Sequence, residues 1–89
     1  MSTVTRLVLD VLKPHQPNAL AFAIKLADLD PQYRIRLSVQ EVDEKTESVV
    51  LHISGEDIDF ERLTEQIRFM GGSVHSIDEV HVRGEQARD

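Results

Sequence analysis

The chain has 89 residues, no cysteine and a formal net charge of −6, from sixteen acidic and ten basic side chains. This length predicts one domain with one hydrophobic core. The absence of cysteine excludes disulfides, thiolate metal sites and cysteine nucleophiles. The excess of acids argues against nucleic-acid binding, which depends mostly on neutralising phosphates. The sequence shows neither an apolar run of membrane-spanning length nor a signal-peptide pattern, so we expect a cytoplasmic protein without a membrane partner.

The most apolar extended stretch is residues 6–15, Arg-Leu-Val-Leu-Asp-Val-Leu-Lys-Pro-His. Every second residue from position 7 to position 11 is apolar and is predicted to face a dry core. The alternate positions are mixed and include Asp10. Because a strand that is apolar on both sides usually lies inside a sheet, we expect a central strand. Pro14 cannot donate a hydrogen bond to a neighbouring strand and is predicted to end it.

A helix is predicted over residues 17–29, with Pro17 at the first helical position, where its missing N–H needs no partner. A helix packed on one side of a sheet needs only one apolar stripe. This segment is apolar well beyond a stripe. We therefore expect a second surface, such as another subunit, to cover it. The alternative is a small protein with an exposed apolar helix.

Three further strands are predicted from alternating apolar and polar residues, at residues 33–42, 47–54 and 73–83. A polar hairpin loop at residues 43–46 joins the first two of them. In the last strand, Ile77 breaks the parity that its valines share. We therefore expect a β-bulge near Asp78 and Glu79.

A second helix is predicted to begin after Asp59, its N-cap, and to end at Gly71 and Gly72. The order strand, helix, strand, strand, helix, strand predicts an α+β fold. It is the ferredoxin-like βαββαβ sandwich, with a four-stranded antiparallel sheet, two helices on one face, and the first and third strands central. We expect a single domain over residues 1–84 and a disordered tail at residues 85–89.

Three segments carry a family resemblance: Leu-Asp-Val-Leu-Lys-Pro-His at 9–15, Asp-Phe-Glu at 59–61 and Gly-Gly-Ser-Val-His-Ser-Ile-Asp-Glu-Val at 71–80. With them the chain resembles a family of small, mainly archaeal proteins known as the domain of unknown function numbered two hundred and eleven. The resemblance covers nearly the whole chain. It implies a ferredoxin-like fold and homo-oligomers, and no established activity. The chain departs from the family pattern at residues 80–83, Val-His-Val-Arg.

The predicted topology gathers polar residues at one rim of the molecule: His15, Asp43, Glu44, Glu47, Ser73 and His75. Histidine and carboxylate ligands suit Zn²⁺ or another first-row divalent ion, and carboxylates without histidine would favour Ca²⁺ or Mg²⁺. The candidate metal ligands are His15, His75, Asp43 and Glu47. Their spacing matches no metal motif, and the alternative is a solvated polar rim with a hydrogen-bonded histidine.

The sheet face without helices is a second candidate, with mixed side chains: Arg6, Val8, Asp10, Leu12, Arg34, Arg36, Val50 and His52. This mixture suits a small anionic ligand. It also suits pairing with the sheet of another subunit, with Asp10 bound to an arginine of that subunit, and we favour this interface. Asp78 and Glu79 are a third candidate, because bulges often lie beside sites. The plainer alternative is a bulge that only accommodates an edge strand.

Several familiar uses of this fold are excluded by residue type. The central strands lack the aromatic side chains with which RNA readers stack bases, and no phosphate-binding glycine loop is present. Ser76 and His75 are neighbours on a strand and should point to opposite faces, so they do not form a catalytic dyad. We therefore do not expect an enzyme.

The function expected from the sequence is a non-catalytic homo-oligomer that binds a small ligand or a divalent cation, Ca²⁺ or Zn²⁺, in a regulatory role. The expected ligand-binding residues are Asp10, His15, His75, Asp78 and Glu79. One alternative is a small metal-assisted hydrolase or other enzyme that uses His15 or His75 with Asp78 or Glu79. Another is a purely structural assembly subunit.

Overall fold

The computed structural model describes residues 2–84. Its elements are β1 (Ser2–Pro14), α1 (Ala19–Ala27), β2 (Arg34–Val42), β3 (Thr46–Ser54), α2 (Phe60–Phe69) and β4 (Ser73–Gly84). This is the predicted order of elements. The tail predicted at residues 85–89 lies outside the described residues.

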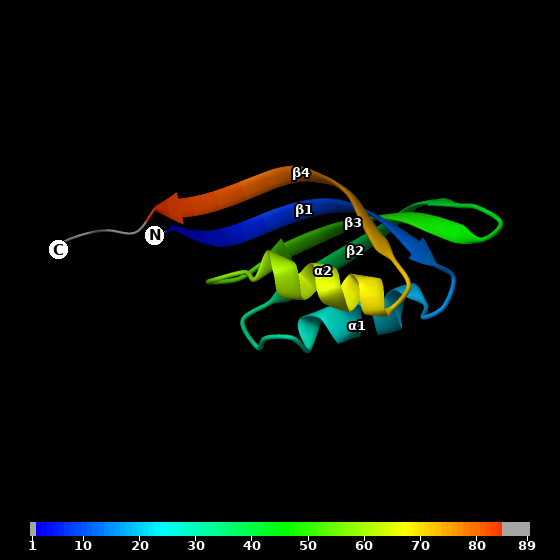
Figure 1. The fold of residues 1–89 in the computed structure, drawn as a ribbon, viewed down its shortest axis with the longest axis horizontal. Helices are drawn as coiled ribbons and strands as arrows, with labels where there is room; N and C mark the ends of the chain where they lie inside the picture. Colours follow the sequence, from blue (N-terminus) through cyan, green and yellow to red (C-terminus); the bar gives the residue numbers. More distant parts are fainter. Residues whose placement is uncertain (1, 85–89) are drawn as a thin grey trace.

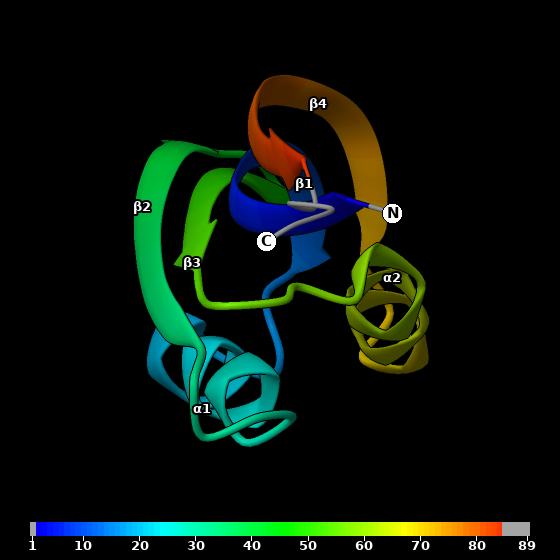
Figure 2. The ribbon, with the colours of Figure 1, turned by 90° about the vertical axis from the view of Figure 1, so that its left-hand side faces the viewer.

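The four strands form one antiparallel sheet in the order β2-β3-β1-β4, with both helices on the same side (Figure 1). The first and third strands are therefore central, as predicted. An end-on view shows the helices below the sheet and the strands curving above them (Figure 2). The ferredoxin-like α+β fold is confirmed. Below, the side that faces the helices is called the helix side, and the opposite side is called the open face.

The core lies between the helices and the two central strands. On β1 the predicted inward parity is confirmed, because Leu7, Leu9 and Val11 are all buried. Their partners on β3 lie directly opposite on the same side of the sheet, Leu51 for Leu9 and Val49 for Val11. Burying each of these side chains contributes about 1.5–3 kcal/mol, which makes this layer the main source of stability.

Helix α1 is shorter than the helix predicted over residues 17–29. Asn18, not Pro17, sets its start, because the Asn18 side chain accepts a hydrogen bond from the Ala21 N–H at 2.9 Å and caps the first turn. Its excess apolar surface is at the exterior. Leu20 is 71% exposed and Ile24 is 48% exposed. These residues form the surface that a second partner was predicted to cover.

Helix α2 has the predicted ends. The Asp59 carboxylate accepts from the Arg62 N–H at 3.1 Å, and Gly71 follows the helix with a φ of 89°. Gly72 then passes so close to β1 that an added Cβ would lie 2.9 Å from the Leu12 carbonyl oxygen. This contact fixes the start of β4 against β1. Within residues 2–84, neither helix is long and apolar enough to span a lipid bilayer.

Strand β4 is bulged where it was predicted to be. Val8 lies opposite Glu79 and Leu9 lies opposite Ile77, so Asp78 is an additional residue. A second bulge was not predicted. Because Asp10 lies opposite Ser76 and Val11 opposite Val74, His75 is also an additional residue. Strand β4 is the last strand on its side of the sheet, and its residues 77–84 are all exposed.

Candidate functional site

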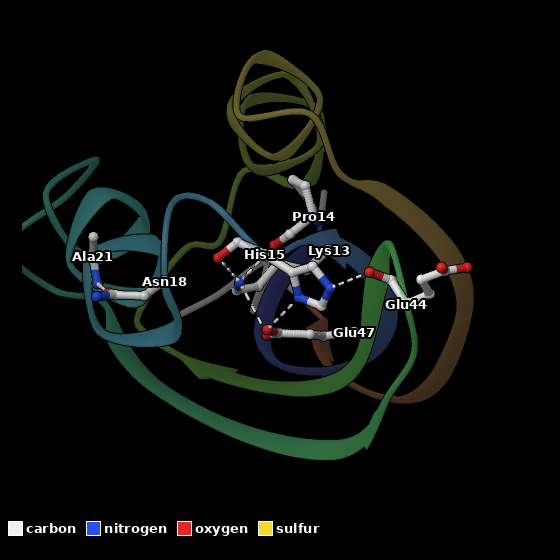
Figure 3. Close-up of polar contacts among 7 residues, drawn as sticks. All are labelled: Lys13, Pro14, His15, Asn18, Ala21, Glu44 and Glu47. Carbon is white, nitrogen blue, oxygen red and sulfur yellow. Dashed lines mark hydrogen bonds and ion pairs between the residues drawn. The ribbon is translucent and has the colours of Figure 1, made fainter.

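The predicted polar rim contains a lysine that is fully buried on the helix side. The Lys13 ammonium lies 3.1 Å from Glu47 Oε1 and donates to the Pro14 carbonyl at 2.7 Å (Figure 3). It also lies 5.7 Å from the centre of the Phe22 ring. A buried charge costs several kcal/mol unless it is paired and hydrogen-bonded. These partners satisfy Lys13, so its role is structural.

His15 completes this cluster with both of its ring nitrogens. Nδ1 lies 3.0 Å from Glu47 Oε2, and Nε2 lies 2.9 Å from the Glu44 carbonyl oxygen (Figure 3). A neutral imidazole has one N–H, whereas two acceptors require two, so the geometry favours the protonated ring. The hydrogen bond to Glu47 raises the pKa of His15 above its ordinary value, and the bonds from His15 and then Lys13 lower the pKa of Glu47. We call Lys13, His15 and Glu47 the buried-lysine cluster.

Of the four predicted metal ligands, His15 and Glu47 lie together in the buried-lysine cluster, and His75 lies elsewhere. A histidine whose two nitrogens both face acceptors has no lone pair for a cation. Asp43 takes part in the hairpin, where its backbone N–H donates to the Thr46 carbonyl at 2.8 Å. Over residues 2–84 no group of three or more His, Asp or Glu side chains is placed to hold a metal ion.

His75 belongs to a different site, on the open face. It lines a partly enclosed hollow of about 280 Å³ together with Asp10, Val11, Leu12, Ser48 and Ser73. The residues come from β1, β3 and β4, and the bulge at His75 is what adds an imidazole beside the strand that carries Asp10. A volume at the lower limit of ligand pockets suits a small ligand. We call this site the Asp10–His75 hollow.

Further along the open face, Glu79 lies among basic side chains. Its Oε2 is 2.8 Å from His81 Nε2 and 3.4 Å from Arg6 Nε, and Arg6 in turn lies 3.3 Å from His52 Nδ1. The hydrogen bond from His81, followed by the charge of Arg6, lowers the pKa of Glu79. Arg36 lies directly opposite His52 on the neighbouring strand. The bulge acid Glu79 therefore partly neutralises a basic surface.

The predicted ligand residues fall in separate places. Asp10 and His75 share the hollow, His15 is in the buried-lysine cluster, and Glu79 lies beside Arg6 and His81. Asp78 accepts a hydrogen bond from the Ser76 hydroxyl at 2.7 Å. For the alternative enzyme, the predicted acids are not the partners found: the carboxylate bound to His15 is Glu47, and the histidine bound to Glu79 is His81.

Sequence reasoning missed Lys13. The signal was present, because Lys13 has the same parity as Leu7, Leu9 and Val11, which were predicted to face the core. A lysine in that position predicts a buried cation that needs an acid on the neighbouring strand. Glu47 lies directly opposite it on β3.

Comparison with known proteins identifies the family of the chain. Residues 5–87 match the model of the DUF211 family, described as "Uncharacterized ArCR". A protein of Methanocaldococcus jannaschii, "Uncharacterized protein MJ0319", is 42% identical over 80 residues, which cover 90% of this chain and 82% of the relative. These matches confirm the resemblance found in the sequence, and the chain belongs to the DUF211 family.

Proposed function

We propose that the protein is a non-catalytic homo-oligomer that binds a small polar ligand in the Asp10–His75 hollow. One observation carries the ligand proposal. Two residues selected from the sequence as ligand-binding, far apart along the chain, line the same hollow. The bulge that was not predicted adds His75 to β4 opposite Asp10 and Val11. Because bulges often re-aim side chains next to sites, this bulge supports a built site over an accidental depression.

The lining of the hollow indicates the chemistry of the ligand. The Asp10 carboxylate accepts hydrogen bonds, the His75 imidazole donates or accepts, and the Ser48 and Ser73 hydroxyls do both. Leu12, 41% exposed, adds an apolar wall. This set suits a small molecule with an amine or several hydroxyls. A divalent cation would find one carboxylate and one imidazole here, and water would have to supply most of its other ligands.

A non-catalytic role fits the same residues. Nucleophilic catalysis needs a hydroxyl held by a base. Among the hydrogen bonds of residues 2–84, none joins Ser48 or Ser73 to His75. Turnover of a bound ligand would contradict this part of the proposal.

Self-assembly is supported by the outer strand β4. Ile77, Val80 and Val82 are 50%, 52% and 55% exposed, and they alternate with charged residues along a strand at the edge of the sheet. An exposed apolar edge strand is a template for another strand. This edge is a stronger candidate than the open face, because the open face carries the polar hollow. The interface with Asp10 that we favoured from the sequence stays a prediction.

Ligand binding is tested by a thermal-shift screen of the full chain against small amines, amino acids, polyols, Ca²⁺ and Zn²⁺. We expect at least one of these compounds to raise the Tm of the wild type. It should raise the Tm equally in Asp57→Asn, the control, because Asp57 is exposed and lies outside the hollow. Asp10→Asn and His75→Ala should each abolish that rise. An equal rise in all four proteins would contradict binding in the hollow.

Assembly is tested by native mass spectrometry. We expect an oligomer in the wild type and a lower mass for Val80→Lys. Val42→Lys is the matched control, because Val42 is 63% exposed on β2, the other edge strand. A wild-type monomer at micromolar concentration would contradict the homo-oligomer.

A further inference from the structure

The open face carries a basic surface at the end away from the Asp10–His75 hollow, and the function proposed above does not use it. We propose that this surface binds a small dianionic oxyanion, of the chemistry of inorganic phosphate or a phosphate monoester. Its residues are Arg6, Arg34, Arg36, His52 and Ser54, and we call it the arginine patch. The proposal is independent of ligand binding in the hollow.

Strand register places the arginines around one small residue. Arg34 on β2 and Arg6 on β1 both lie directly opposite Ser54 on β3, one from each side. Since neighbouring strands are about 4.8 Å apart, the two arginine backbones lie about 10 Å apart. Their long side chains can meet above the serine, whose hydroxyl can donate to an oxyanion. Arg36 and His52 are opposite each other and two residues further along the same face, so they border the same space.

The arginine patch carries more positive charges than there are acidic side chains paired with them. Arg34 and Arg36 are exposed, and within residues 2–84 neither forms an ion pair. Arg6 shares the single carboxylate of Glu79 with His81. Like charges on neighbouring strands repel each other, and a bound anion would remove this cost. The chain as a whole has a net charge of −6, so overall composition does not account for a cationic patch.

A hollow at this end supplies further hydrogen-bond donors. It measures about 390 Å³ and is lined by Thr5, Gln32, Arg34, Ser54, Gly55 and Glu56. The amide of Gln32 and the hydroxyl of Ser54 can donate to oxyanion oxygens, whereas the Thr5 hydroxyl donates to the His81 carbonyl at 3.3 Å. Glu56 is the acid at its border, and it favours a ligand small enough to remain on the arginine side.

Phosphate fits the arginine patch better than other anions. The guanidinium fork matches phosphate oxygens in pairs, and three arginines against one carboxylate suit two negative charges better than one. A nucleic acid fits poorly. Single-stranded binding needs aromatic side chains on which bases stack, and the open-face residues of the central strands are not aromatic.

The test is a titration of the full-length ¹⁵N-labelled protein, followed by NMR at constant ionic strength. The probes are sodium phosphate and glycerol 3-phosphate. We expect saturable shifts at the amides of Arg34, Arg36, His52 and Ser54. Equal affinity for both probes would assign the patch to free phosphate, and tighter binding of the ester would assign it to a phosphorylated metabolite. Arg34→Gln and Arg36→Gln should each weaken binding about tenfold or more, because each removes a charge-assisted hydrogen bond.

Arg62→Gln is the matched control, since it removes one exposed arginine from α2 on the other side of the molecule and should leave the affinity unchanged. The proposal is overturned if shifts grow linearly without saturation, or if Arg62→Gln weakens binding as much as Arg36→Gln. It is also overturned if dilution of the protein without any probe produces the same amide shifts, and these dilution shifts are absent in Asp10→Asn. A second copy of the chain would then occupy the patch. Loss of ligand binding in the hollow leaves this result unaffected, so the two proposals fail separately.

Discussion

The two sides of the sheet treat positive charge in opposite ways. On the helix side, Lys13 is fully buried, and its ammonium contacts the Glu47 carboxylate and a backbone carbonyl. On the open face, Arg34 and Arg36 are exposed, and neither pairs with an acid of residues 2–84. Both sides belong to the same antiparallel sheet, so the helices make the difference.

The comparison separates structural charge from charge available for binding. Under the helices, water is excluded and an unpaired charge would cost several kcal/mol, so the chain itself has to supply every partner. On the open face, water screens each charge, and the chain loses little by leaving it unpaired. A satisfied buried cation therefore indicates stability, and an unneutralised group of exposed cations indicates a ligand.

The largest expected effect comes from removing the buried cation. Lys13→Ala should destabilise the fold by about 3 kcal/mol, because it leaves a cavity and an acid that has lost one of its two basic partners. Arg36→Ala, the matched removal on the open face, should change stability by less than about 0.5 kcal/mol. Urea unfolding of both variants at pH 6 measures the difference. Equal losses in the two variants would remove the distinction between the two sides.

Hydrogen bonds should follow the same division at a smaller scale. Asp59→Ala removes the N-cap of α2 and should cost about 1 kcal/mol, since the Arg62 N–H then lacks its partner. Ser76→Ala removes an exposed 2.7 Å hydrogen bond to Asp78 on β4 and should cost less than about 0.5 kcal/mol. The midpoint of urea unfolding of each variant gives the comparison. A larger loss in Ser76→Ala would show that the edge strand carries structural weight that its exposure does not indicate.

Most of the fold could be predicted because each element has a local signal. Alternation gave the strands, Asp59 gave the start of α2, and Ile77 broke the parity of β4 at the bulge that the structure places at Asp78. The start of α1 was missed because a proline at the first helical position and an asparagine cap compete over adjacent residues. The amide of Asn18 prevailed, since it satisfies a free N–H that Pro17 cannot satisfy.

The candidate site could be predicted only in part, because bulges change the face to which a residue belongs. Alternation counts residues in steps of two, and each additional residue reverses the count. Ile77 differs in parity from both Val74 and Val80, so the sequence also carried a sign of the bulge at His75, but only the bulge near Asp78 was predicted, and the rim was expected to unite His75 with His15. The structure instead groups His75 with Asp10 and His15 with Glu47. Charge balance on each face required the register of all four strands, which sequence patterns do not give residue by residue.

The smallest expected effect is the dependence of stability on pH, and it distinguishes the two sides by sign. Glu47 on the helix side and Glu79 on the open face both have a pKa lowered from 4.5. Each contributes stability above that value and loses it as the pH falls, so acid should weaken both sides. The pKa of His15 is raised from 6.5. Its contribution is complete below pH 6.5 and is lost as the pH rises through the raised pKa.

The alkaline loss should therefore come from the helix side. We expect Tm of the wild type to fall as the pH rises above 6.5, and His15→Gln to flatten this part of the curve while keeping the acid part. Glu79→Gln should do the reverse, reducing the acid loss and leaving the alkaline loss intact. Because water reaches His15 and Glu79, both differences should be smaller than the loss of the Asp59 cap. If Tm still falls at alkaline pH in His15→Gln, the imidazole of His15 is not the group that loses a proton. Lys13 would then be the only cation that binds Glu47 in the folded state.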